Sequence, residues 1–183
     1  ARLRASDPND QIGRSIAMER GILVAGSEPD ALYVFARHRD RWIERQKLQS
    51  PVAGGGDFGA SVAIRDRIII VGAPGVDLPD EFRSDGDAFV FLPHRGSWFQ
   101  SQSLNAPLPE LSPSAQFGSK VAMGRRLAAV GVPITAEDEI RPTSVVTVFD
   151  RIGAEFTPAH TGYGAGPDDQ TIPDFDMSGR RLI

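Results

Sequence analysis

Five acidic residues stand close together in one short segment of the chain: Asp77, Asp80, Glu81, Asp85 and Asp87. Carboxylate oxygens are the ligands that hard cations such as Ca²⁺ prefer, in sets of about six to eight. The four aspartates are therefore weak candidates for a metal site. Their spacing matches no calcium-binding loop, however, and Pro79 and Phe82 interrupt it. A solvated acidic loop is the favoured interpretation, and we predict no metal ion or other cofactor.

The serines and histidines are arranged unlike a catalytic set. Three serines recur at matching places, Ser15, Ser61 and Ser119, but none lies in a Gly-x-Ser-x-Gly turn. His38 and His94 also recur, each three residues after a phenylalanine, which indicates turns in separate repeat units rather than one site. The chain has no cysteine, so thiolate chemistry and cysteine-ligated zinc are excluded. We therefore predict that this segment is not an enzyme.

Paired glycines mark three copies of one repeat. The first marker of each copy precedes a short alanine-containing run: Gly13, Gly59 and Gly118. The second marker ends an apolar run: Gly26, Gly72 and Gly131. Both markers are 46 residues apart between the first two copies and 59 residues apart between the second and third. Two markers that keep the same offset indicate a true internal repeat, which must be recognised before a fold is assigned.

Each copy holds four short apolar runs that predict β-strands. The third run ends in phenylalanine in every copy: Phe35, Phe91 and Phe149. The fourth run follows the pattern Trp-x-x-x-Gln-x-Leu over 42–48 and 98–104, and is degraded over 156–160. The runs are rich in β-branched and aromatic residues and lack a 3.6-residue period, so we predict strands and little helix. Four antiparallel strands per copy, with buried inner strands, predict an all-β fold of β-propeller blades.

The predicted blades do not close a ring. They cover residues 11–50, 51–106 and 107–161, while 1–10 predict the outer strand of a preceding blade and 162–183 the start of a further one. Propellers typically have four to eight blades, and an incomplete ring leaves open strand edges. We therefore expect this partial propeller to be completed by the remainder of a longer polypeptide or by neighbouring subunits.

Two motifs in the second copy carry a family resemblance. Residues 58–64 read Phe-Gly-Ala-Ser-Val-Ala-Ile, and residues 69–74 read Ile-Ile-Val-Gly-Ala-Pro. Together they closely resemble the FG-GAP repeat, which builds the seven-bladed propeller of integrin α-chains and of many bacterial extracellular proteins. The resemblance implies a secreted, cell-surface or periplasmic protein whose loops bind partners.

The chain departs from that family in the loops that bind calcium in integrin blades. In calcium-binding integrin blades, an Asp-x-Asp-x-Asp-Gly loop joins the first and second strands. Here the corresponding turns, over 19–21, 65–67 and 124–126, are short and carry more arginine than acid. They lack the six to eight oxygen ligands that Ca²⁺ takes, so the family's metal site is not expected here.

The charge and hydropathy of the chain exclude some partners. Its net charge is −4, which argues against nucleic acid as a main partner. No apolar stretch approaches the roughly 20 residues needed to span a bilayer. The basic residues are almost all arginine, and the only lysines are Lys47 and Lys120. This bias fits either an arginine-lined anion site or the codon usage of a GC-rich genome, and codon usage is the favoured explanation.

Two long loops between second and third strands are the predicted partner-binding surface, because long loops on a rigid scaffold commonly carry function. The residues expected to contact a partner are Asp77, Asp80, Glu81, Phe82, Arg83, Glu137, Asp138 and Glu139. The leading hypothesis is a non-catalytic extracellular or periplasmic module that presents these loops to a protein or glycan. The alternatives are a structural propeller subunit of a larger assembly and the propeller portion of a larger hydrolase.

Overall fold

The computed structural model describes residues 3–76, 86–105, 116–133 and 144–163, together with 177–178 and 181–182. Every regular element in these ranges is a β-strand. Within the described part of the chain, no helix is long and apolar enough to cross a membrane.

Three four-stranded antiparallel sheets are built from consecutive strands. The first contains β1 (Gln11–Glu19), β2 (Ile22–Glu28), β3 (Ala31–His38) and β4 (Arg41–Gln49). The second contains β5 (Ser61–Arg65), β6 (Ile68–Ala73), β7 (Asp87–His94) and β8 (Ser97–Ser103). The third contains β9 (Lys120–Met123), β10 (Leu127–Pro133), β11 (Ser144–Ile152) and β12 (Glu155–Tyr163). A short pair, β13 (Met177–Ser178) and β14 (Arg181–Leu182), follows.

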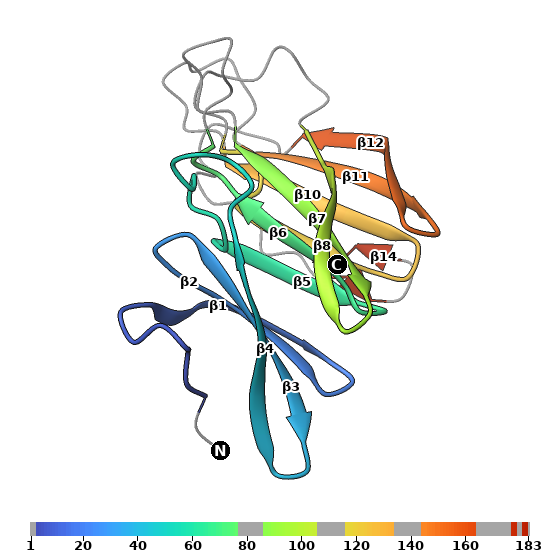
Figure 1. The fold of residues 1–183 in the computed structure, drawn as a ribbon. Coiled ribbons are helices and arrows are strands. Elements are labelled where there is room, and N and C mark those ends of the chain that lie inside the picture. Colours follow the sequence, from blue (N-terminus) through green and yellow to red (C-terminus); the bar gives the residue numbers. More distant parts are fainter. Residues whose placement is uncertain are drawn as a thin grey trace.

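The three sheets confirm the predicted all-β architecture of four-stranded blades in an unclosed ring, and we name them blades 1, 2 and 3 in chain order. The blades lie beside one another (Figure 1), and their innermost strands are neighbours: β1 contacts β5, and β5 contacts β9. The first strand of each blade therefore faces the axis about which the blades are arranged.

The core lies between blades because the second and third strands are apolar on both faces. All six residues of β6 are buried, whereas the outer strand β4 alternates between exposed and partly buried positions. One cluster joins Val24 and Val34 of blade 1 to Ile69 and Phe89 of blade 2. A second joins blades 2 and 3 in the same way. Burying one side chain of this size stabilises the fold by about 1.5–3 kcal/mol.

The paired glycines of the sequence meet between blades. The Ser61 hydroxyl of blade 2 donates a hydrogen bond of 2.7 Å to the carbonyl oxygen of Gly118 in blade 3. A Cβ added to Gly72 would overlap that same oxygen. Blades 1 and 2 repeat the arrangement, with Ser15 bonded to the Gly59 carbonyl at 2.7 Å. The paired glycines therefore recur because two backbones approach so closely at each of these blade boundaries that no side chain fits between them.

The outer strands of adjacent blades are joined by a glutamine side chain, an arrangement we call the amide bridge. The Gln46 amide of β4 donates to the Trp98 carbonyl oxygen at 2.9 Å and accepts from the Trp98 backbone N–H at 2.7 Å. Gln102 of β8 forms the same pair of bonds with Phe156 of β12, at 2.6 and 3.1 Å. The Trp-x-x-x-Gln-x-Leu pattern thus encodes a contact between blades as well as a strand.

Residues 3–10 contain no strand. Leu3 nevertheless packs against the blade 1 cluster of Tyr33 and Phe35. Leu48 and Leu104, at the ends of the outer strands, join the clusters shared with the next blade in the same manner. The assignment of residues 1–10 to a preceding blade stays a prediction.

Candidate functional site

Most of the residues predicted to bind a partner or a metal fall outside the described residues. These are Asp77, Asp80, Glu81, Phe82, Arg83, Asp85, Glu137, Asp138 and Glu139. The strands that flank them are described: one segment follows β6 and precedes β7, and the other follows β10 and precedes β11. Their role as a partner-binding surface stays a prediction.

Asp87 is the one metal candidate that the structure describes, and it is a buried carboxylate at the start of β7. It is only 5% exposed, and its Oδ1 accepts the Ala88 backbone N–H at 2.7 Å. Burial raises the pKa of Asp87 to about 6, although hydrogen bonds from the Ala88 N–H and the Ser103 hydroxyl act to lower it. Within the described ranges, no three His, Cys, Asp or Glu residues are placed to share a metal ion.

The serines and histidines singled out in the sequence are distributed over separate blades. The Ser15 and Ser61 hydroxyls are both bonded to carbonyl oxygens of the next blade, as described above. His38 ends β3, while His94 ends β7 and packs edge-on against Phe99 with ring centroids 6.0 Å apart. The structure therefore does not bring these four residues together in one catalytic site.

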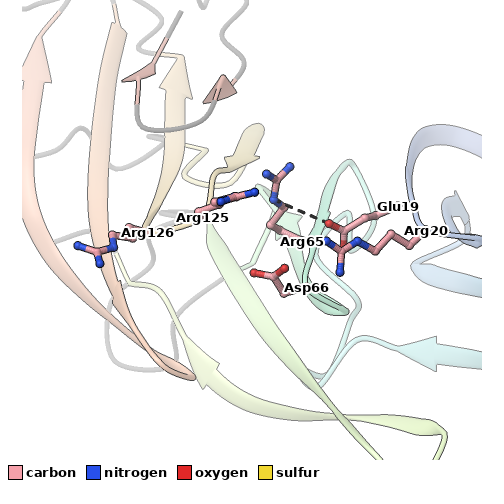
Figure 2. Close-up of a pocket in the computed structure, with 6 residues that line it drawn as sticks. All are labelled: Glu19, Arg20, Arg65, Asp66, Arg125 and Arg126. Atoms are coloured by element: carbon pink, nitrogen blue, oxygen red, sulfur yellow. Dashed lines mark ion pairs between the residues drawn. The ribbon is translucent and has the colours of Figure 1, made fainter.

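The turns that join the first and second strands of the three blades line a common hollow of about 500 Å³. Figure 2 shows its six lining side chains, two from each turn: Glu19, Arg20, Arg65, Asp66, Arg125 and Arg126. The first two turns are two-residue connections with positive φ at Arg20, Gly21, Asp66 and Arg67, as tight hairpins require. Such short turns hold the side chains close to the ends of the inner strands.

The hollow carries more positive than negative charge. Arg65 Nε lies 3.8 Å from Glu19 Oε1. Asp66 Oδ2 accepts a 3.0 Å hydrogen bond from Nη1 of Arg151, whose side chain is 12% exposed. Both acids are thus paired with arginines. Sequence reasoning noted that these turns are rich in arginine, but not that the three turns converge.

A second polar cluster lies against blade 1, and no pattern in the sequence predicted it. The Tyr33 hydroxyl donates to Asp10 Oδ2 at 2.7 Å, and Lys47 Nζ lies 2.7 Å from the same oxygen. Burial acts to raise the pKa of Asp10, but hydrogen bonds from Lys47 and Tyr33 outweigh it and lower that pKa below its usual value. The Asp10 side chain is only 4% exposed. The cluster ties the segment before β1 to β3 and β4.

The fold and the repeated inter-blade contacts define a scaffold of the β-propeller class. Residues 42–91, from the outer strand of blade 1 through the third strand of blade 2, match the family model of the FG-GAP repeat. The chain therefore carries an FG-GAP repeat, which confirms the resemblance read from residues 58–64 and 69–74. No curated protein matches the chain.

Proposed function

We propose that this chain is a non-catalytic interaction module that presents the loops of a propeller scaffold to a protein or glycan outside the cytoplasm. The observation that carries the proposal is the rigid joint between blades, in which buried cores, glycine contacts and amide bridges all recur. A scaffold of this kind fixes the ends of its loops, so that exposed loop side chains can bind a partner with little loss of conformational entropy.

The surface proposed for the partner is formed by the two segments between second and third strands. Blade 2 fixes the ends of its segment firmly: the Gly86 N–H donates to the Val76 carbonyl at 3.2 Å, and Gly86 bridges to Phe117 of blade 3. Acidic residues dominate the predicted contacts, which favours a partner with a basic patch.

Binding to an array of extracellular proteins and glycans tests this proposal. The loop variant combines Glu81→Gln with Asp138→Asn, and the matched control combines Glu155→Gln with Asp40→Asn, both of which are exposed acids away from these segments. We expect at least one partner to bind the wild type and the control equally and the loop variant roughly tenfold more weakly. Absence of any partner, or equal binding by the loop variant, would contradict the proposal.

A structural role in a larger assembly is a second candidate, and one observation favours it. Met18 of β1 is 64% exposed, whereas its equivalents in the other blades, Ile64 and Met123, are 9% and 7% exposed because a preceding blade covers them. Ile16 on the same strand is 60% exposed. Blade 1 thus presents to solvent the face that blades 2 and 3 bury, and a blade of a neighbouring subunit would cover it.

A further inference from the structure

Three guanidinium groups in the hollow have no acidic partner within the described residues. The hollow is lined by four arginines and two acids, and both acids are engaged by Arg65 and Arg151. Arg20, Arg125 and Arg126 are left without an ion pair in the described ranges. This local excess of positive charge occurs in a chain whose net charge is −4.

The three groups come from two blades but line one cavity. Arg20 belongs to the turn of blade 1, and Arg125 and Arg126 belong to the turn of blade 3, with the turn of blade 2 between them (Figure 2). In Figure 2 the side chain of Arg125 extends towards Arg65, whereas that of Arg126 points away from them. Like charges that lie close together repel one another, and a bound anion removes that repulsion. The planar guanidinium also presents paired N–H donors that match the oxygens of phosphate, sulfate and carboxylate.

Hydrogen bonds within blades 2 and 3, and one side chain between them, hold the walls of the hollow in place. The Arg67 carbonyl accepts the Trp98 indole N–H at 2.7 Å, and the Arg126 carbonyl accepts the Arg151 backbone N–H at 2.7 Å. Arg151 Nη1 lies 3.5 Å from the Arg125 carbonyl while it bonds Asp66, so one side chain links the turns of blades 2 and 3. The backbone that carries Arg125 and Arg126 is therefore fixed before any ligand arrives.

We propose that this hollow binds a small oxyanion, the phosphate or sulfate group of a sugar-sized ligand. Its volume of about 500 Å³ falls within the range of small-molecule sites and exceeds what a single inorganic ion fills. A cation is disfavoured because both carboxylates are already paired. The inference goes beyond the proposed function, because it concerns the turns between first and second strands rather than the segments that join second to third.

Titration calorimetry with inorganic phosphate, inorganic sulfate and the 6-phosphate and 6-sulfate of glucose tests the proposal, at constant ionic strength set with chloride. The test variant combines Arg20→Gln with Arg125→Gln. The matched control combines Arg39→Gln with Arg95→Gln, two exposed arginines that do not line the hollow. All the substituted side chains are exposed, so we expect every variant to keep the wild-type melting temperature.

We expect saturable binding by the wild type and the control, and a loss of roughly tenfold or more in the test variant. Tighter binding of the phosphate ester would identify a phosphorylated ligand, and tighter binding of the sulfate ester a sulfated saccharide; either order supports the oxyanion site. No saturable binding of any of the four probes, or equal binding by the test variant and the wild type, would overturn it. A test variant that melts early is replaced by Arg125→Gln alone, which must then weaken binding.

Discussion

At the residue scale, blades 2 and 3 approach so closely that their boundary has no room for one additional carbon atom at Gly72. Gly72 sits where a Cβ would overlap the Gly118 carbonyl oxygen, and the Ser61 hydroxyl bonds that same oxygen. Asp87 lies at the same boundary, since its own carbonyl is the group that a Cβ on Gly118 would meet. A carboxylate held there loses hydration, which is why its pKa is raised.

The Gly72→Ala substitution should destabilise the chain by roughly 3 kcal/mol, because the new methyl group forces two backbones apart. Gly162→Ala is the matched control: it lies in β12, and a Cβ there would meet nothing within 4 Å. We expect the control to change the free energy of unfolding by less than about 1 kcal/mol. Urea denaturation of both variants measures the difference, and equal midpoints would contradict the close approach.

Asp87 should make stability depend on pH. Its folded-state pKa is about 6 and its ordinary value 3.8, so the folded state binds the proton more tightly than the unfolded chain. The free energy of unfolding should therefore fall by about 2–3 kcal/mol as the pH rises from about 3.8 to about 6. Above about pH 6 it should stay level.

The Asp87→Asn variant keeps the acceptor for Ala88 but cannot ionise, so it should lack this fall. Urea denaturation of wild type and variant at about pH 4 and about pH 7 gives the comparison. We expect the variant to be the more stable of the two at the higher pH. A variant that loses as much stability as the wild type across this range would show that another group causes the dependence.

At the scale of the element, the outer strand both pairs with the third strand of its own blade and contacts the next blade. In every blade its pairing with the third strand shifts register at the same place, after Val34, Val90 and Val148. Such an irregularity bends the strand and increases its twist. The glutamine of the amide bridge stands directly beside it in blades 1 and 2, paired with Val34 and Val90 respectively. The bulge and the bridge together set how one outer strand meets the next blade.

The Gln102→Ala substitution should destabilise the chain by about 2 kcal/mol, because it leaves the N–H and carbonyl of Phe156 without partners at a largely buried position. Gln100→Ala on the same strand is the control, since Gln100 is exposed. Thermal unfolding of the two variants makes the measurement. Equal melting temperatures would mean that the amide bridge contributes nothing to the joint between blades 2 and 3.

At the scale of the whole molecule, the exposed face of blade 1 is the feature that the fold leaves incomplete. Each joint between blades buries a first-strand side chain equivalent to Met18, and only in blade 1 is that side chain mostly exposed within the described structure. Apolar side chains grouped on such a face mark it as a site of association.

Light scattering coupled to size exclusion tests whether that face associates. If a neighbouring subunit covers blade 1, the chain should form a species larger than 19.8 kDa, and Met18→Lys should shift it towards the monomer. Ile152→Lys is the control, because Ile152 is 75% exposed and lies at the end of β11 in blade 3. A wild-type chain that stays at 19.8 kDa at every concentration would contradict the assembly hypothesis.

The amino-acid sequence by itself determined the strands, the blades and their number. Strand propensity, turn residues and the spacing of Gly59 and Gly72 act over a few residues, so the pattern can be read without a structure. The position of the inter-blade glycines was also predictable, although the carbonyl oxygen that excludes a side chain was not.

Only the tertiary structure decided which groups meet across blades. The turns that line the hollow come from three repeats, and each of their side chains alone resembles a solvated turn residue; stacking of the blades brings them together. The same holds for Gln102, whose partner lies 54 residues away, and for Asp87, whose burial depends on the next blade. Contacts of this kind depend on how the sheets pack, and the local pattern of residues within one repeat does not encode them.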